Sequence, residues 1–304
     1  LNLKPGDEVI VPAFTFVSTV EAVCLLGLKP VFIDIEPETF LLETNNIKHL
    51  LSNKTRVIIP VHLFGQCCDM VEIKKIAKNN NLFIIEDAAQ SIGSRCSVNA
   101  TSLTKKFSGT IGHIGITSFY PSKNLGCFGD GGAIFTQNKK LSQTIRLLAN
   151  HGQKQKYTHD IIGLNSRLDA LQASILSFKL SLLDEFNAKR NKVANFYNDY
   201  FSAIPWIKTP VKRDNSEHVY HQYSVVLSSK INRKNLQAYL LKKGIPTMIY
   251  YPVPLHQQKA YQHYSSHSLP VAEHVCKHII SLPIHPEMDV QQMEFIGEHI
   301  KNYI

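Results

Sequence analysis

The 304-residue sequence lacks several features that mark common protein classes. No apolar run approaches the roughly 20 residues of a membrane-spanning helix, and no internal repeat or low-complexity tract is present. The six cysteines show no metal-ligand spacing, and the adjacent pair Cys67 and Cys68 makes a poor disulfide framework. We therefore expect no membrane association and no metal site, and we expect reduced thiols in a cytoplasmic protein.

The sequence also lacks any long cluster of basic residues, although its formal net charge is +9. Its lysines and arginines are scattered, with only short pairs such as Lys105-Lys106 and Lys242-Lys243. A positive net charge favours anionic partners, but nucleic-acid-binding proteins concentrate that charge on one face or helix. We therefore expect phosphates or nucleotides as partners, and no nucleic acid. The first residue is Leu1, so we expect N-terminal residues, with any targeting signal, to be missing.

Short apolar runs alternate with helical patterns through the first half of the chain. The runs occupy residues 8–11, 30–33, 57–61, 82–85, 114–119 and 132–136. Helical spacing or helix-ending residues separate most of them, which is typical of βαβ units around a mainly parallel sheet. The ligand of such a sheet binds at the carboxyl ends of the strands.

The second half of the chain reads differently. Ser166 and Asp169 fit a capping box, and the apolar stripe after them predicts one long helix that reaches about residue 200, with its stripe in the core. Residues 205–217 are polar and are the best linker candidate. Beyond them we predict a compact α/β domain with strands at 220–227 and 247–250 and helices at 233–243, near 271 and near 290. The domains expected are 1–185 and 186–304, the second including the bridging helix.

Two residues at strand ends suggest the chemistry. Asp87 ends the apolar run at 82–85, and Lys123 follows the run at 114–119 just before a loop in which four of seven residues are glycine. Such a pair suits pyridoxal 5′-phosphate, because the lysine amine can condense with the cofactor's aldehyde while the carboxylate keeps its ring nitrogen protonated. Either residue alone is most often a solvated surface group. Only the joint pattern favours a cofactor site.

Six segments, in order, carry a resemblance to a known family. They are PGDEVI at 5–10, PAFTF at 12–16, EDAAQS at 86–91, SFYPSK at 118–123, NSRLD at 165–169 and YPVPL at 251–255. With these segments the chain resembles the DegT/StrS-type sugar aminotransferases of the aspartate-aminotransferase fold (fold type I). The resemblance implies an α/β fold with a three-layer large domain, a mainly parallel sheet and a smaller C-terminal α/β domain.

The resemblance also implies roles for individual residues. Lys123 would bind the cofactor covalently and move the proton, and Asp87 would pair with the ring nitrogen. Contacts to the ring and the phosphate would come from Phe16, Gln90 and Ser118. Asn165 would reach the cofactor phosphate of a neighbouring subunit, which implies a homodimer with shared active sites. Nucleotide-sugar contacts would come from Arg167, Tyr250, Tyr251 and His256, although relatives usually carry histidine at the Tyr250 position.

The implied reaction moves an amine from an amino acid, by family habit glutamate, to a keto-sugar attached to a nucleotide. The segments at 65–67, 121–127 and 150–153 look most like those of enzymes that act at C3 of UDP-linked 2-acetamido-3-keto-hexuronic acids. With such a substrate, Arg167 would meet the sugar carboxylate. C4 aminotransferases and dTDP-linked 3-keto sugars remain open. Polysaccharide or lipopolysaccharide biosynthesis is the expected setting.

Two other hypotheses come from outside transamination. A dehydrase of the same fold would carry histidine at the Lys123 position, so the lysine argues against it. A catalytically inactive fragment or binding subunit is suggested because family members hold the cofactor phosphate at a helix N-terminus upstream of the segment that Leu1 opens. Nothing in residues 1–304 replaces that segment, so the chain taken alone is expected to bind cofactor weakly and to have a damaged dimer interface.

Overall fold

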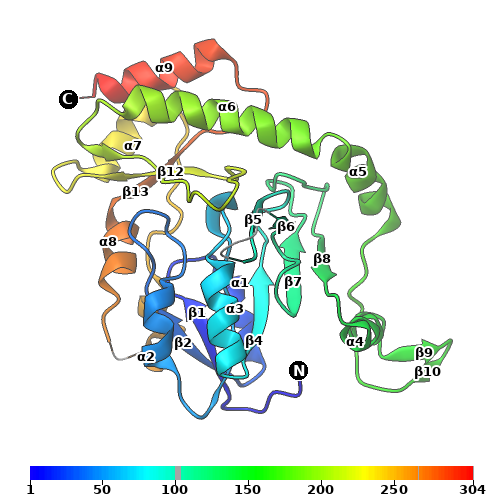
Figure 1. Cartoon of the computed structure of the whole chain (residues 1–304). Coiled ribbons are helices and arrows are strands. Elements are labelled where there is room, and N and C mark those ends of the chain that lie inside the picture. Colours follow the sequence, from blue (N-terminus) through cyan, green and yellow to red (C-terminus); the bar gives the residue numbers. More distant parts are fainter. Residues whose placement is uncertain (100–103, 266, 304) are drawn as a thin grey trace.

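The fold is described from a computed structural model that covers residues 1–99, 104–265 and 267–303. A large sheet with helices around it forms the lower part of the molecule in Figure 1, and the C-terminal elements lie above it. The helix α6 (Leu183–Phe201) runs along the top, over both parts.

A six-stranded sheet organises the large part, in the order β2-β1-β3-β4-β7-β8. All neighbours are parallel except β7 and β8, which are antiparallel. Every residue of β1 is buried, as expected for a central strand covered on both faces. The strands are β1 (Glu8–Pro12), β2 (Lys29–Ile33), β3 (Thr55–Ile58), β4 (Phe83–Asp87), β7 (Ile114–Ser118) and β8 (Gly132–Phe135).

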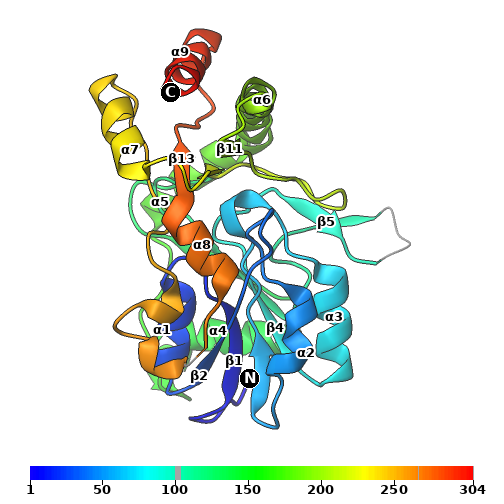
Figure 2. The same ribbon diagram turned by 90° about the vertical axis from the view of Figure 1, so that its left-hand side faces the viewer.

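Helices cover both faces of this sheet. Figure 2 shows α1 on one face and α2 and α3 on the other. Asp69 caps the start of α3 by accepting a hydrogen bond from the Glu72 amide. The bounds are α1 (Ser18–Leu25), α2 (Ile47–Leu50) and α3 (Met70–Asn79), with the 3-10 turns η1 (Thr44–Asn46) and η2 (Leu63–Gly65) and the small hairpin β5 (Arg95–Ser97) and β6 (Lys105–Phe107).

The long bridging helix was predicted with the wrong start and the wrong environment. The segment forms two helices, α5 (Ala170–Leu180) and α6, and α5 begins at Asp169 without a side-chain cap, so there is no capping box at Ser166. The predicted apolar stripe is not core, since Leu171 and Phe178 are exposed and only Leu176 of α5 is buried.

The C-terminal part has a core of its own, built on an antiparallel sheet in the order β11-β12-β13. The helix α6 packs against α9 so closely that a side chain at Gly297 would collide with the ring of Tyr200. The predicted strand at 247–250 is wrong, because only Met248 pairs, through a single bridge to Ser281. The elements are β11 (Ile207–Lys208), β12 (Tyr223–Leu227), α7 (Arg233–Lys242), η3 (Leu255–Gln257), η4 (Gln262–Tyr264), α8 (Pro270–His278), β13 (Ile279–Leu282) and α9 (Val290–Lys301).

One segment projects from the molecule. Beyond β8 the chain forms α4 (Lys139–Ala149) and the hairpin β9 (Gln153–Gln155) and β10 (Thr158–His159), which stand apart at the lower right of Figure 1. No residue of α4 is buried, although its apolar side chains gather on one face. Ile162 and Leu164, which follow the hairpin, are also largely exposed. This arm (residues 136–168) therefore presents apolar surface that the rest of the described chain does not cover.

The described residues show neither a membrane-spanning helix nor a cluster of metal-ligating side chains. None of the helices in residues 1–99, 104–265 and 267–303 is both long enough and apolar enough to cross a bilayer. Over the same ranges no three histidine, cysteine, aspartate or glutamate side chains gather as metal ligands would. His274 and His278 lie one turn apart on α8, with ring centroids 4.3 Å apart. Within the described residues no third side chain of this kind joins them to complete a metal site.

Candidate active site

The carboxyl ends of β4 and β7 open into a cavity of about 840 Å³. Its wall carries side chains from β4 and β7, from the segment leading into α1, and from the loop around residues 250–251. Lys123 and Asp87 both lie on this wall, so the two side chains predicted to share a site do share one. Cavities at this end of a parallel sheet are the usual ligand sites of α/β proteins.

Asp87 is held by bonds to both carboxylate oxygens. The Thr19 hydroxyl donates to Oδ2 over 2.7 Å, and the Ala89 amide donates to Oδ1 over 3.1 Å. The residue is 7% exposed, and its backbone pairs with the chain at Val61. A buried carboxylate fixed in this way offers a negative charge of set direction, which suits a protonated nitrogen in the cavity.

Lys123 follows β7 in a tight turn. Its amide donates to the carbonyl of Tyr120, and the chain then turns back at Gly126, where any side chain would collide with the carbonyl of Pro121. Burial lowers the pKa of the Lys123 amine, and the nearby charge of Asp87 opposes that shift. A lowered pKa keeps a larger share of the amine neutral, which is the form that acts as a nucleophile or base.

Three further predicted residues line the same cavity: Gln90, Phe16 and Tyr251. Gln90 accepts a hydrogen bond from the Phe64 amide over 2.8 Å and donates to the Tyr251 hydroxyl over 3.0 Å. The rings of Phe16 and Tyr251 have centroids 6.2 Å apart, and Phe16 is 53% exposed. Phe16 is therefore no ordinary core residue, because its exposed ring borders the cavity.

Ser118 and Tyr250 complete the predicted residues on the cavity wall. The Ser118 hydroxyl accepts a hydrogen bond from the Tyr120 amide over 3.2 Å and can still donate its own proton. Hydroxyls at the end of a strand are suitable donors to a phosphate.

Asn165 and Arg167 lie outside this cavity. They line a neighbouring hollow of about 950 Å³ between β8 and α4, where Arg167 Nε donates to Asn165 Oδ1 over 2.9 Å. Both side chains are exposed. The described chain therefore does not bring them to its own Lys123, which is compatible with the expected use of Asn165 by a neighbouring subunit.

The prediction for His256 is wrong. The side chain is 5% exposed, its Nε2 lies 3.2 Å from the Glu273 carboxylate, and its ring packs near Phe32. It does not line the cavity. The loop turns at Pro254, so the histidine points back into the protein while Tyr250 and Tyr251 face the cavity.

Among the cavity residues that the sequence analysis missed are Thr19 and His221. Thr19 lies 68 residues before its partner Asp87, and His221 lies beyond the linker. Neither belongs to a strand end followed by a glycine loop, which was the signal that identified Lys123. Only the fold brings them to the site.

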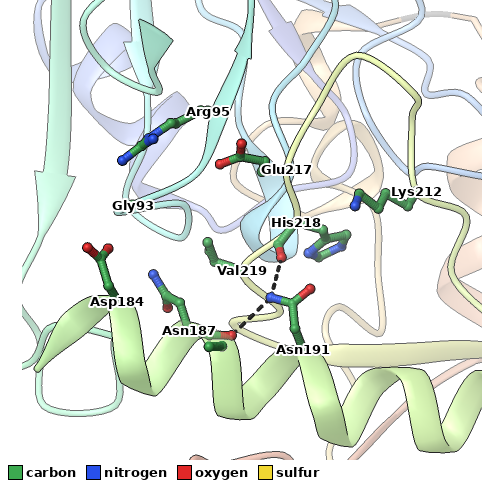
Figure 3. A pocket seen from close by; sticks show the side chains of 10 residues that line it. Gly93, Arg95, Asp184, Asn187, Asn191, Lys212, Glu217, His218 and Val219 are labelled. Carbon is green, nitrogen blue, oxygen red and sulfur yellow. Dashed lines mark hydrogen bonds between the residues drawn. The ribbon is translucent and has the colours of Figure 1, made fainter. Parts of the chain in front are cut away.

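A smaller hollow of about 320 Å³ lies where α6 meets the loops around residues 93 and 218. In Figure 3 the side chain of Asn191 donates over 2.9 Å to the carbonyl of His218, which attaches this loop to α6, and over 2.9 Å to the carbonyl of Asn187 within the helix itself. Asn187 also accepts a hydrogen bond from Asn124, the residue after Lys123. The bridging helix is thus linked by side-chain bonds to the lysine loop.

Comparisons with known proteins identify the family. The model of the DegT/DnrJ/EryC1/StrS aminotransferase family matches residues 1–301. The chain belongs to this family. The expected resemblance and α/β aminotransferase fold are confirmed, and the enzyme class is that of the family, the nucleotide-sugar aminotransferases.

Several relatives are similar over nearly the whole chain. The UDP-2-acetamido-2-deoxy-3-oxo-D-glucuronate aminotransferase of Pseudomonas aeruginosa is 43% identical over 302 residues, which is 99% of this chain and 81% of that protein. A pleiotropic regulatory protein of Geobacillus stearothermophilus is 42% identical, over 99% and 80%. The dTDP-3-amino-3,6-dideoxy-alpha-D-galactopyranose transaminase of Aneurinibacillus thermoaerophilus is 39% identical, over 98% and 79%.

Solved structures agree with these relatives. DesV of S. venezuelae, in complex with a ketimine intermediate, superposes with a TM-score of 0.92 at 36% identity, over 99% of this chain and 79% of that one. NtdA of Bacillus subtilis, with the cofactor PMP bound, superposes with a TM-score of 0.87 at 32% identity, over 98% and 68%.

Proposed function

We propose that this protein transfers an amine from an amino acid to a nucleotide-linked keto-sugar with pyridoxal 5′-phosphate as its cofactor. The observation that carries the proposal is the common cavity of Lys123 and Asp87 at the carboxyl ends of β4 and β7. Membership of the aminotransferase family and the cofactor named for the NtdA structure support it. The cofactor, when bound, supplies an electron sink that makes a proton on the neighbouring carbon removable.

The residues of the cavity suit that cofactor. Lys123 would bind its aldehyde, Asp87 would hold the protonated ring nitrogen, and the exposed ring of Phe16 would lie against a ring face. Gln90 would contact the ring hydroxyl side, and the Ser118 hydroxyl would donate to the phosphate. Each assignment is supported by a polar or aromatic group that lies on the cavity wall.

Lys123 would also move the proton. Burial lowers the pKa of its amine, so a larger share of the amine is neutral and can accept a proton at Nζ and return it to a nearby carbon. Asp87, with both carboxylate oxygens hydrogen-bonded, would stay fixed in its orientation toward the ring nitrogen.

We propose a UDP-linked 2-acetamido-3-keto-hexuronic acid as the acceptor and glutamate as the donor. The 43% identical relative from P. aeruginosa, named for a UDP-linked 3-oxo-glucuronate, favours this sugar. The dTDP-sugar transaminase at 39% identity keeps a dTDP-linked sugar as the alternative. Tyr250 and Tyr251 would contact the sugar from the cavity wall. Arg167, which like Asn165 lies outside the cavity of its own chain, would meet the sugar carboxylate in the site of a neighbouring subunit.

We further propose a homodimer that acts in the cytoplasm in polysaccharide or lipopolysaccharide biosynthesis. The apolar side chains of the arm and of α5 are exposed in the single chain, which supports a second copy as their cover. Asn165 would then serve the partner's site. The six cysteines are free thiols, which supports a reducing compartment.

The decisive experiment compares wild type with Lys123→Ala. Purified protein is loaded with pyridoxal 5′-phosphate, and glutamate should change its visible absorption and convert the cofactor to pyridoxamine phosphate. A panel of UDP- and dTDP-linked keto-sugars should then identify the acceptor by mass. Lys123→Ala should abolish both steps, and Lys242→Ala, which removes an exposed amine on α7 outside the cavity, should abolish neither. Persistent conversion in Lys123→Ala would refute the proposal, and absence of conversion in wild type would favour a binding subunit.

A further inference from the structure

The lysine loop (residues 120–131) carries Lys123 on a backbone that is intrinsically flexible. Glycine occupies three of its positions, and a glycine loses more conformational freedom on folding than any other residue. Short-range backbone bonds, such as the one from the Lys123 amide to the Tyr120 carbonyl, close the turn locally. Where Lys123 lies relative to Asp87 therefore depends also on contacts that reach the loop from other elements.

One face of α5 packs against this loop. Gln172, Leu176 and Lys179 are spaced by four and three residues, so they lie on the same side of the helix. Leu176 is buried, and it belongs to a small apolar core together with Leu125 and Cys127 of the loop. The helix thus lies directly on the segment that follows Lys123.

Two polar side chains on that face bond to the backbone of the loop. Gln172 Oε1 accepts a hydrogen bond from the Phe128 amide over 2.8 Å. Lys179 Nζ donates to the Gly126 carbonyl over 2.6 Å and lies 5.4 Å from the centroid of the Phe128 ring. Hydrogen bonds from a charged donor are stronger than those between neutral groups. The Gly126 carbonyl is therefore firmly attached to α5.

Asn187 on α6 connects the lysine loop with the loop that follows Asp87. Its Oδ1 accepts a hydrogen bond from Asn124 Nδ2 over 2.8 Å, and its Nδ2 donates to the Ile92 carbonyl over 3.2 Å. The residue is 7% exposed. A Cβ atom at Gly93 would lie 2.5 Å from Asn187 Nδ2, so this approach requires glycine. One side-chain amide thus holds both loops against the same point of α6.

We propose that Lys179 and Asn187 are positioning residues for Lys123, which hold the lysine loop in a fixed place relative to Asp87. The proposal rests on the function proposed above, in which Lys123 and Asp87 act on one cofactor. In the part of the chain that the structure describes, neither positioning side chain lines the active-site cavity. Both would therefore act through the loop and not by contact with cofactor or substrate.

A lysine loop released from these helices should give Lys123 a different environment. Burial lowers the pKa of the Lys123 amine, and the charge of Asp87 opposes that shift. Because burial is the larger effect, an amine that leaves its place should titrate nearer to the ordinary value for lysine. The titration of Lys123 in the chain without cofactor therefore reports on its position.

The test compares Lys179→Met and Asn187→Ala with wild type. Each variant removes a bond to the loop, and Asn187→Ala does so without changing the charge. The full chain without cofactor is labelled with acetic anhydride at a series of pH values, and peptide mass spectrometry gives the titration midpoint of Lys123. Both variants should raise the midpoint toward the ordinary value of about 10.4. With cofactor bound, amine transfer should slow about tenfold in each, with KM unchanged.

Two further variants serve as controls. Lys179→Arg keeps a charged donor and should restore the wild-type midpoint and most of the rate. Arg233→Met is the matched control, because Arg233 also donates to backbone carbonyls, those of Cys276 and Ile279, and lies away from the cavity. It should leave the Lys123 midpoint unchanged, even if urea unfolding shows an equal loss of stability.

A wild-type midpoint in both folded variants would overturn the proposal, and so would an equal rise in Arg233→Met. If Asn187→Ala does not fold, the variants at the half-buried Lys179 decide alone. Labelling needs neither cofactor nor substrate, so a raised midpoint in a protein that transfers no amine would refute only the proposed function. Amine transfer at the wild-type rate in both variants would refute only the positioning role.

Discussion

At the scale of single residues, the orientation of the Asp87 carboxylate depends on a hydroxyl from a helix that is distant in sequence. Thr19 on α1 donates to Oδ2 over 2.7 Å, within the buried end of the cavity. A hydrogen bond to a charged group of this kind contributes about 1.5–3 kcal/mol. Removing it loosens the carboxylate that is proposed to face the cofactor's ring nitrogen.

We therefore expect Thr19→Val to reduce the single-turnover rate of amine transfer roughly tenfold while the protein still folds. The rate is measured at saturating substrate by stopped-flow absorption. Thr144→Val, which removes a hydroxyl from the exposed helix α4, serves as the control and should match wild type. Equal rates for both variants would mean that Asp87 needs no support from Thr19.

Glu86, the neighbour of Asp87, has a structural role. It is fully buried on the other side of β4, where it lies 2.9 Å from His62 Nε2 and accepts hydrogen bonds from the amides of Gly109, Ile111 and Gly112. His62 Nδ1 accepts the Cys68 amide, so Nε2 carries the proton that is donated to Glu86. One carboxylate thus fixes the loop that leads into β7, the strand before Lys123.

Glu86→Gln should lower the free energy of unfolding by about 2–4 kcal/mol, because its amide nitrogen would face backbone donors. Burial alone would raise the pKa of the Glu86 carboxyl, but the bonds from His62 and the loop amides outweigh it and lower the pKa. The wild type should therefore be stabilised above the ordinary carboxyl pKa and lose that stability as the pH falls through the lowered value.

Urea unfolding at several pH values measures both effects. The difference in unfolding free energy between wild type and Glu86→Gln should shrink on acidification. A difference that stays constant with pH would contradict the assignment of the charge to Glu86. Glu72→Gln, at an exposed ion pair on α3, provides the control and should change little.

At the scale of elements, the N-terminus of α8 is capped by a carboxylate that lies just after β2. The N-cap residue Leu269 has no side chain that could cap this helix, which has Pro270 in its first turn. Instead Asp34, just after β2, accepts the amides of Val271 and Ala272 over 3.0 and 2.8 Å. A negative charge at this helix end satisfies free donors and complements the helix dipole.

Asp34→Ala should lower the free energy of unfolding by about 1–2 kcal/mol, the usual cost of a lost cap. Thermal unfolding followed by circular dichroism measures it. Asp289→Ala removes the side-chain cap of α9, which is local in sequence, and should cost a similar amount. If Asp34→Ala unfolds like wild type, the hydrogen bonds between Asp34 and the start of α8 do not stabilise the protein.

These elements also explain what the sequence could predict. Strands such as β1 and β4 contain short continuous apolar runs because both faces of the sheet are covered, so the runs were visible and the mainly parallel sheet was predicted correctly. The pair Lys123 and Asp87 was found since both follow such runs. By contrast, β13 was missed, because its four buried residues directly follow α8 without a turn signal.

The errors have physical causes as well. The stripe on α5 has the spacing of a core helix, yet Leu171 and Phe178 are exposed, since periodicity shows that a face is apolar and not what covers it. His256 was assigned to the site by its neighbours in sequence, and the turn after Pro254 directs it away. The support of Asp87 by Thr19 joins elements that no local pattern connects.

At the scale of the whole molecule, we expect a dimer because the apolar surface of the arm and α5 is exposed in the single chain. Asn165 at the base of the arm lies away from the cavity of its own chain and would complete that of a partner. If active sites are shared in this way, mixing two inactive variants should restore part of the activity.

Lys123→Ala and Asn165→Ala should each be nearly inactive alone. After unfolding together and refolding in equal amounts, about one quarter of wild-type activity should return, because half of the dimers are mixed and each mixed dimer has one intact site. Activity assays and mass photometry follow the mixture. Two copies of Lys123→Ala refolded together are the control, and no recovery in the mixture would refute the shared site.

The contact of Asp34 with α8 also has a consequence for the order of events on the ribosome. The carboxylate and the amides that it receives are 237 and 238 residues apart. At a synthesis speed of 5–20 residues per second, the end of β2 waits about 10 to 50 seconds for this partner. During that interval Asp34 has only the local bond from the Ile35 amide, and the end of β2 lacks the helix terminus that faces it in the folded protein.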